Sequence, residues 1–145
     1  MRGPAENLAF DFVRECVLLG RRWRARVDER MRGSGLTLAR ATVIYWISKL
    51  PEGATQRELA DIVGIEGPTL VRILHALEEQ RLVERVPVPG DRRAKGLRLT
   101  PAAQPLLDQL DATVDALVGD YLGDLDGRRL RSATKLARDA REALD

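Results

Sequence analysis

Two short segments of helical periodicity, joined by a glycine-bounded turn, lie in the middle of the 145-residue chain. Thr55 and Glu58 begin the first segment at the spacing of a capping box, in which each side chain bonds to the other residue's backbone N–H. Gly64 ends this segment, and Gly67 opens the second one three residues later. Pro68 is expected at the first helical position, where its missing N–H costs nothing. The spacing predicts two consecutive helices with a tight turn between them.

Each of these two helices has one apolar face. In the first helix the apolar residues at helical spacing are Leu59, Ile62 and Val63. In the second helix they are Leu70, Ile73, Leu74 and Leu77. The opposite face of the second helix carries Pro68, Arg72, His75 and Glu79. This arrangement predicts one buried side and one polar side that is available to a partner.

A hairpin with a basic tip is expected directly after the second helix. Beyond Leu82 the apolar period changes to two, and a turn signal at Pro89-Gly90-Asp91 separates the two runs. The cations beside this turn are Arg92, Arg93 and Lys95. Residues 81–98 hold six basic and two acidic side chains, although the net charge of the whole chain is only +2. This concentration of positive charge indicates an anionic partner at one place.

Longer helices flank this central region, so the fold is predicted to be mainly α. Residues 4–31 form one apolar stripe, made of Leu8, Phe12, Cys16, Leu19, Trp23, Val27 and Met31. A second helix is expected from Thr37 to Leu50, and its stretch from Val43 to Ile47 is apolar nearly all round, as in a buried helix. After the hairpin, Thr100 is the expected N-cap of a helix that continues to Tyr121 and bends at Pro105. A last helix ends at Leu144.

Several classes of protein are excluded by composition. No apolar run approaches the roughly 18 residues that span a bilayer, and the first residues lack the apolar core of a signal peptide, so a cytoplasmic protein without a membrane partner is expected. The single cysteine, Cys16, and the single histidine, His75, cannot form an internal disulfide or a usual zinc site. We find no phosphate-binding loop and no nucleophile elbow. The chain is therefore predicted not to be an enzyme and to carry no metal or cofactor.

Two short helices followed at once by a basic hairpin are the order of a winged helix-turn-helix. In that fold the second helix enters the major groove of DNA, and the hairpin, or wing, reaches the backbone or the minor groove. Arg72 can bond bidentately to guanine, unless it pairs with Glu78 or Glu79 instead, and His75 is either a DNA-facing donor or an idle surface residue. The candidate DNA-contacting residues are Thr55, Gln56, Pro68, Thr69, Arg72, His75, Asp91, Arg92, Arg93 and Lys95.

The segment from Leu36 to Leu106 resembles the MarR family of bacterial transcriptional regulators, and within it the SlyA-type branch. The most diagnostic part is the Asp-x-Arg pattern of Asp91 and Arg93, followed by Leu99-Thr100. The resemblance implies a homodimer on a pseudo-palindromic operator in double-stranded DNA, with Arg93 in the minor groove and Asp91 steadying it. It also implies that residues 1–35 and 101–145 form dimerisation helices around a DNA-binding lobe of residues 36–100.

Many MarR-type proteins bind small aromatic acids between the dimer helices and the DNA-binding lobe, which implies such an effector here. The SlyA-type pattern has a tryptophan where Ala41 stands, whereas this chain has Tyr45 and Trp46. Together with Trp23 these aromatics either line a ligand cavity or belong to the core. The arginines Arg21, Arg22, Arg24 and Arg26 are either solvated or dimer-facing, or hold a ligand carboxylate.

Two alternatives remain beside the ligand-responsive regulator. Peroxide-sensing relatives have a reactive cysteine in the first helix, where Cys16 stands, but the tyrosine that they use one turn later is Gly20 here. Cys16 is then either a redox sensor or a small apolar residue of the stripe. The other alternative is a winged helix that binds protein, which the strongly basic wing disfavours.

Overall fold

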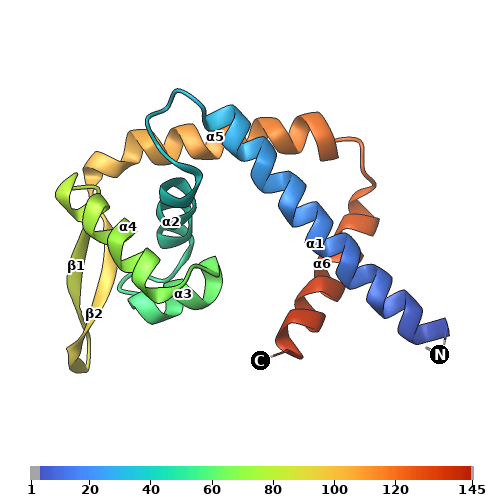
Figure 1. Ribbon diagram of the computed structural model, residues 1–145, viewed down its shortest axis with the longest axis horizontal. Coiled ribbons are helices and arrows are strands. Elements are labelled where there is room, and N and C mark those ends of the chain that lie inside the picture. The colour runs from blue at the N-terminus through green and yellow to red at the C-terminus, as the bar shows by residue number, and fades with distance from the viewer. Residues whose placement is uncertain (1–3, 145) are drawn as a thin grey trace. The chain divides into compact units, whose positions relative to one another are not determined.

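The computed structural model describes residues 4–144, with side chains from residue 7 onward, and it is mainly helical (Figure 1). Its elements are α1 (Pro4–Met31), α2 (Leu38–Lys49), α3 (Gln56–Val63), α4 (Gly67–Glu79), β1 (Val83–Val88), β2 (Asp91–Leu99), the 3-10 turn η1 (Pro101–Ala103), α5 (Gln104–Leu122) and α6 (Gly127–Glu142). The contacts divide the chain into two units, one of Met1–Glu29 with Asp115–Asp145 and one of Arg30–Val114. The predicted mainly α fold with a single hairpin is confirmed.

The second unit is built around the packing of α2 against α3 and α4, with β1 against α4 (Figure 1). Its apolar core includes Val43, Ile44 and Ile47 of α2, Leu59 and Val63 of α3, and Leu70, Leu74 and Leu77 of α4. Burial of these side chains supplies the main free energy that holds the unit together. The polar face predicted for α4 is confirmed, because Pro68, Arg72, His75 and Glu79 are all exposed.

Two burial predictions differ from the structure. Ile62 was expected in the core, yet 44% of its surface is exposed, because Leu59 and Val63 already fill the inward positions of the short α3. Tyr45 and Trp46 are half-buried, so α2 is not buried all round. The α1 stripe, which the resemblance assigns to a dimer interface, is mostly exposed or half-buried in the single chain, and only its residues Val27 and Met31 are buried.

The predicted capping box at the start of α3 is confirmed. The Glu58 N–H donates to the Thr55 hydroxyl at 3.3 Å, and the Glu58 carboxylate accepts from the Thr55 N–H at 2.6 Å. Accepting the backbone N–H and the hydroxyl of Thr55 holds the pKa of the Glu58 carboxyl below its ordinary value. At the other end, Gly64 caps α3 with φ of 62°, a left-handed conformation that suits glycine. Pro68 is the second residue of α4, not the first as predicted, but both positions lie in the turn whose N–H groups have no helical partner.

The end of α4 is fixed by a Schellman motif that joins the helix to the wing. The N–H of Arg81 donates to the Glu78 carbonyl, and that of Leu82 donates to the Leu77 carbonyl, each at 2.9 Å. Arg81 therefore takes φ of 55°, which is uncommon for a residue with a side chain. The residue after β2 reinforces this corner, because the N–H of Thr100 donates to the Leu82 carbonyl at 3.0 Å.

The start of α5 differs from the prediction. The hydroxyl of Thr100 donates to the Arg81 carbonyl, so Thr100 does not cap a helix with its side chain. A 3-10 turn follows, and α5 begins only at Gln104. Pro105 therefore lies in the first turn of α5, where it removes no helical hydrogen bond, and the predicted bend inside one long helix is wrong.

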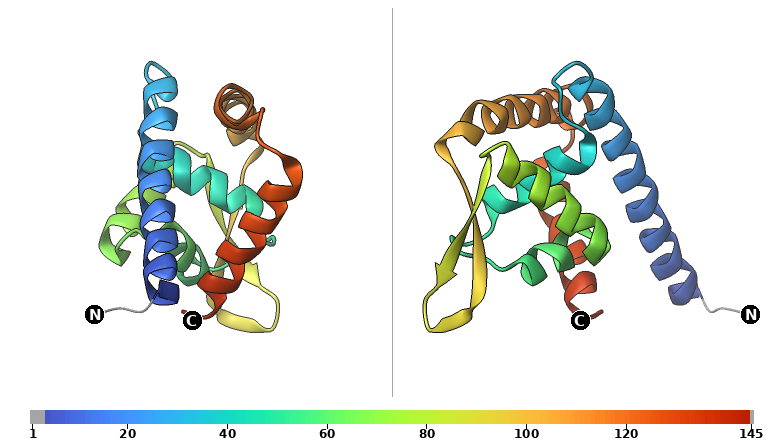
Figure 2. Two further views of the ribbon diagram at one scale, coloured as in Figure 1. Left: turned by 90° about the vertical axis from the view of Figure 1, so that its right-hand side faces the viewer. Right: turned by 60° about the vertical axis from the view of Figure 1, so that its left-hand side comes forward.

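The wing is an antiparallel pair whose register shifts near its tip. Val83 pairs with Leu99 at the base, and Val88 pairs with Asp91 at the turn, so β2 has a bulge between Asp91 and Lys95. The turn end of the hairpin, yellow in Figure 2, projects beyond α3 and α4. Bulges increase the local twist of a strand and re-aim its side chains, and this one lies beside the three cations of the tip.

The base of the wing is tied to the loop before α3. The N–H of Leu97 donates to the Ala54 carbonyl at 2.8 Å, and Thr55 and Gly96 form an isolated β-bridge. A Cβ at position 96 would lie 2.3 Å from the carbonyl oxygen of Gly53, so only glycine fits there without movement. These contacts therefore fix the position of the wing relative to the start of α3.

The first unit contains α6 and most of α1, with the end of α5. The guanidinium of Arg26 lies over the ring of Tyr121, 5.7 Å from its centroid. No residue of α6 is buried in this single chain. None of the helices in residues 4–144 has the length and hydropathy needed to cross a membrane.

Candidate nucleic-acid interface

The exposed face of α4 carries the side chains predicted to read bases. The Arg72 guanidinium donates one long hydrogen bond, 3.4 Å, to the hydroxyl of Thr69 one turn earlier. Arg72 forms no ion pair with any side chain that the structure describes, and the predicted alternative of pairing with Glu78 is wrong because Glu78 pairs with Arg85. His75 is exposed on the same face. Arg72 therefore keeps most of its donors available to an external acceptor.

The positive charge of the wing is confined to its tip. Arg98 pairs with Glu84 at 2.8 Å and with Glu52 at 3.3 Å, and these bonds, with that to Glu84 the stronger, raise the pKa of Arg98 above its ordinary value. Arg85 is paired with Glu78. The tip cations Arg92, Arg93 and Lys95 are exposed, and none pairs with a side chain in the described part of the chain. Because the arginines at the base of the wing are paired with carboxylates and the cations at the tip are not, the wing has a localised basic patch at its tip.

Asp91 organises the backbone of this tip. Its carboxylate accepts from the N–H of Arg93 at 2.8 Å and from that of Ala94 at 3.2 Å. These bonds are of the local Asp-to-backbone kind that stabilises turns. Asp91 thus fixes the bulge from which Arg92 and Arg93 project, and it acts on the backbone of Arg93 rather than on its guanidinium.

Thr55 and Gln56, also candidate contacts, both have partners within the chain. The Thr55 hydroxyl belongs to the capping box and donates to Glu58 at 2.8 Å. The side-chain oxygen of Gln56 accepts from Nη2 of Arg85 at 3.3 Å. Arg85, the donor to Gln56, was not among the candidate residues. The signal was its place in phase with the apolar Val83 on an alternating strand.

The three aromatic residues considered for a ligand site are divided between α2 and α1. Tyr45 and Trp46 make an edge-to-face contact with ring centroids 5.5 Å apart, and the Lys49 ammonium lies 5.1 Å from the centroid of Tyr45. Trp23 belongs to α1 in the other unit. Cys16 is exposed on α1. Within residues 4–144, no group of three His, Cys, Asp or Glu side chains is arranged to hold a metal ion.

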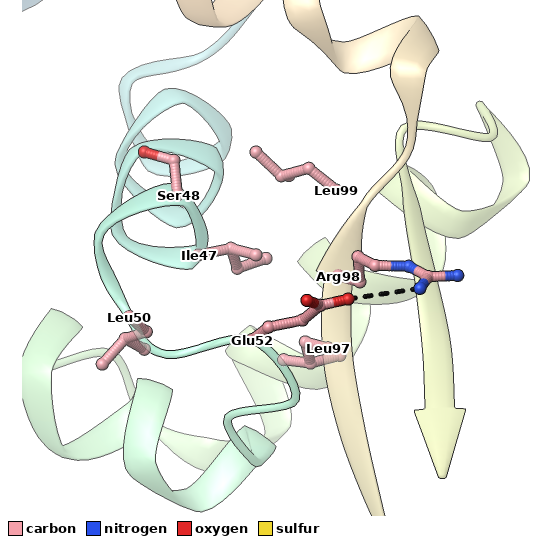
Figure 3. A pocket seen from close by; sticks show the side chains of 7 residues that line it. All are labelled: Ile47, Ser48, Leu50, Glu52, Leu97, Arg98 and Leu99. Atoms are coloured by element: carbon pink, nitrogen blue, oxygen red, sulfur yellow. Dashed lines mark hydrogen bonds and ion pairs between the residues drawn. The ribbon is translucent and has the colours of Figure 1, made fainter. Parts of the chain in front are cut away.

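A shallow hollow of about 220 Å³ lies between the end of α2 and the base of the wing (Figure 3). Its lining consists of Ile47, Ser48, Leu50, Glu52, Leu97, Arg98 and Leu99. The Arg98–Glu52 ion pair crosses one side of it, as Figure 3 shows. None of the three predicted ligand-contacting aromatics lines this hollow.

Comparison with known proteins identifies the family. Residues 34–94 match the MarR_2 family model, described as MarR family. The crystal structure of a transcriptional regulator, PA3341, is 37% identical with a TM-score of 0.84, and the match covers 92% of this chain and 97% of that chain. The chain belongs to the MarR family. As a MarR-family protein it is a winged-helix, DNA-binding regulator of transcription.

Two further solved structures share the fold of this MarR-family protein. CouR from Rhodococcus jostii RHA1, solved with p-coumaroyl-CoA, is 25% identical with a TM-score of 0.71, and the match covers 99% of this chain and 95% of that chain. MepR from S. aureus, in its DNA-binding conformation, is 18% identical with a TM-score of 0.77, over 92% of this chain and 98% of that chain. These two structures therefore support the winged-helix fold of the chain.

Proposed function

We propose that two copies of this chain bind a pseudo-palindromic operator in double-stranded DNA, with α4 in the major groove and the wing tip at the minor groove. The observation that carries this proposal is the distribution of unpaired cations. Arg72 and the tip cations Arg92, Arg93 and Lys95 have no acidic partner in the described chain, whereas Arg85 and Arg98 do. An anionic duplex is the partner that complements such a pattern.

The proposed roles follow from the position of each side chain. Arg72 reads a base edge in the major groove, with Thr69 one turn earlier and His75 on the same face. Pro68 lies in the first turn of α4, where backbone N–H groups favour a phosphate. Arg93 enters the minor groove and responds to its width, while Arg92 and Lys95 bind phosphates. Asp91 holds the tip in the conformation that presents these side chains.

A second copy is the proposed partner of α1, the end of α5 and α6. In the single chain these helices expose apolar side chains that include Leu8, Val13, Val17, Leu19, Tyr121, Leu130 and Leu136. A surface with this many large exposed apolar residues indicates a protein interface. The dimer would set two α4 helices about one turn of DNA, roughly 34 Å, apart. We also propose that the chain belongs to the SlyA-type branch, because its wing carries the sequence Asp-x-Arg. Its proposed location is the cytoplasm.

A small aromatic acid is the proposed effector. The support is the ligand of CouR, p-coumaroyl-CoA, whose acyl group is aromatic. Tyr45 and Trp46 of α2 are the proposed contacts, since neither is fully buried and aromatic faces bind such rings. The ligand would weaken DNA binding by its differential affinity for two arrangements of the DNA-binding lobes.

Fluorescence anisotropy tests the proposed function. The protein is titrated into a labelled duplex that carries the DNA upstream of its own gene, and into a scrambled duplex of the same composition, at one near-physiological salt concentration. Clear preference for the upstream duplex, with two chains per duplex at saturation, is expected. Preference for neither of these duplexes, nor for any sequence in a randomised pool, would contradict the proposal.

A further inference from the structure

Arg85 of β1 joins three elements of the DNA-binding unit through one guanidinium. Its Nε donates to Glu78 near the end of α4 at 3.0 Å, and its Nη2 donates to Gln56 at the start of α3 at 3.3 Å. The side chains of Arg85 and Glu78 are 30% and 26% exposed, whereas those of Arg98 and Glu84 in the wing are 47% and 45% exposed. The Arg85 junction is thus better shielded from water than the wing pair, which strengthens its charge-assisted hydrogen bonds.

The contact with Arg85 fixes the orientation of the Gln56 amide. A guanidinium has five N–H donors and no acceptor, so it can be faced only by the amide oxygen. The NH₂ group of Gln56 consequently points away from Arg85, and it has no hydrogen-bond partner in the described part of the chain. The side of the Gln56 amide that faces away from Arg85 therefore presents the two N–H donors of the NH₂ group and no acceptor.

The position of Gln56 suits a phosphate. It is the first residue of α3, the helix that crosses the DNA backbone in a helix-turn-helix. Phosphate oxygens accept hydrogen bonds but donate none, and glutamine side chains are among their usual protein partners. The hydroxyl of neighbouring Thr55 is already used in the capping box, which leaves the Gln56 amide as a side-chain donor at this helix start, beside the exposed Arg57.

We propose that Arg85 is a positioning residue for DNA binding, because it orients Gln56 so that the Gln56 amide donates to a backbone phosphate of the bound duplex. This inference rests on the proposed function. Arg85 itself stays within the protein, neutralised by Glu78, and makes no contact with DNA. Lysine cannot replace it, since one ammonium on a flexible stem does not reproduce two donors held in a rigid plane.

A double-mutant cycle on DNA affinity tests this assignment. The probe is a duplex recovered from a randomised pool by the wild-type protein, with a scrambled duplex beside it, and dissociation constants come from fluorescence anisotropy. The variants are Arg85→Met, Gln56→Met and the double variant. Arg98→Met is the matched control, because it also removes one ion-paired arginine of the wing but leaves α3 and α4 untouched.

Loss of one hydrogen bond to a charged phosphate lowers affinity about tenfold, and each of the two bound chains loses one. Each single variant should therefore bind both duplexes about a hundredfold more weakly. The double variant should bind no more weakly than Arg85→Met, because the two changes remove the same contact. Arg98→Met should stay within about twofold of the wild type, the effect usual for a change away from the contact surface. Gln56→Met at wild-type affinity, or losses that multiply in the double variant, would overturn the assignment.

A second readout separates positioning from a structural role. In the wild type, the side-chain NH₂ signal of Gln56 in a ¹⁵N correlation spectrum should shift when the recovered duplex is added. In Arg85→Lys, which keeps the charge, that shift should be lost while thermal unfolding still shows a folded protein. An unchanged shift in Arg85→Lys would overturn the positioning role. If the wild type recovers no duplex from the pool, the proposed function itself fails, and the inference fails with it.

Discussion

Gly96 of the wing and Gly53 of the loop before α3 approach so closely that a Cβ at position 96 would lie 2.3 Å from the Gly53 carbonyl oxygen. Neither backbone can move without breaking the hydrogen bond from Leu97 to Ala54 or the bridge between Thr55 and Gly96. The orientation of the wing relative to α3 therefore depends on the absence of one side chain.

Gly96→Ala should destabilise the protein by about 1–3 kcal/mol, the usual cost of overpacking a tight contact. Urea unfolding followed by circular dichroism measures this difference. Gly20→Ala is the matched control: nothing lies within 4 Å of its Cβ, and it lies inside α1, so it should stabilise by about 0.5–1 kcal/mol. Equal stabilities for the two variants would contradict the close approach.

Glu58 should make the stability of α3 depend on acid. Because its hydrogen bonds with Thr55 hold the pKa of the folded state below the ordinary value of 4.5, the stabilisation is fully present above that value. It is lost as the pH falls through the folded-state pKa. Thermal unfolding of the wild type and of Glu58→Gln should therefore differ most near neutral pH and converge in acid. A gap between the two that widens on acidification would contradict the capping role.

Arg93→Ala should weaken binding to every duplex, because the wing acts through the backbone and the width of the minor groove. The slope of log affinity against log salt should fall by about one charge for each of the two bound chains. Anisotropy titrations at several salt concentrations measure the slope, and Arg98→Ala is the control, since its charge is already paired. A slope that is the same in Arg93→Ala and the wild type would remove the wing tip from the interface.

Arg72→Ala should reduce specificity rather than general affinity. Loss of a base contact costs roughly 1–3 kcal/mol on the cognate duplex, with a much smaller loss on scrambled DNA. The ratio of the two dissociation constants is the measured quantity. If Arg72→Ala loses as much on scrambled DNA, Arg72 contacts phosphate instead of a base.

Cys16→Ser should leave the response to peroxide unchanged, although the thiol is exposed in the single chain. Gly20 stands where peroxide-sensing relatives have a tyrosine. DNA binding measured before and after peroxide treatment decides this point. Release of DNA by peroxide from the wild type but not from Cys16→Ser would establish a redox sensor.

The predictable parts of this fold are those set by neighbouring residues. The Thr55–Glu58 capping box and the Gly64 cap depend on residues within one turn, so the sequence alone was sufficient to predict them. Thr100, which precedes a proline, has the local sequence pattern of an N-cap. Its hydroxyl instead donates to the Arg81 carbonyl, 19 positions away in the chain. Local patterns do not report such competing partners.

The candidate site shows the same division. Exposure of Arg72 and His75 follows from helical periodicity, and the basic tip follows from the turn signal. Composition cannot show that Arg98 is neutralised by Glu52, 46 positions away, nor that Arg85 reaches Gln56 across 29 positions. These contacts depend on the register of β1 and β2 and on how the loop before α3 meets the wing.

Hydroxyl-radical footprinting of the recovered duplex tests the central claim most directly, because it reports where the protein covers the DNA backbone. Two α4 helices and two wings on one operator predict two protected patches on one face of the duplex, about one helical turn, roughly 34 Å, apart. A single protected patch, or weak protection spread evenly along the duplex, would contradict recognition of a pseudo-palindromic operator by two copies of this chain.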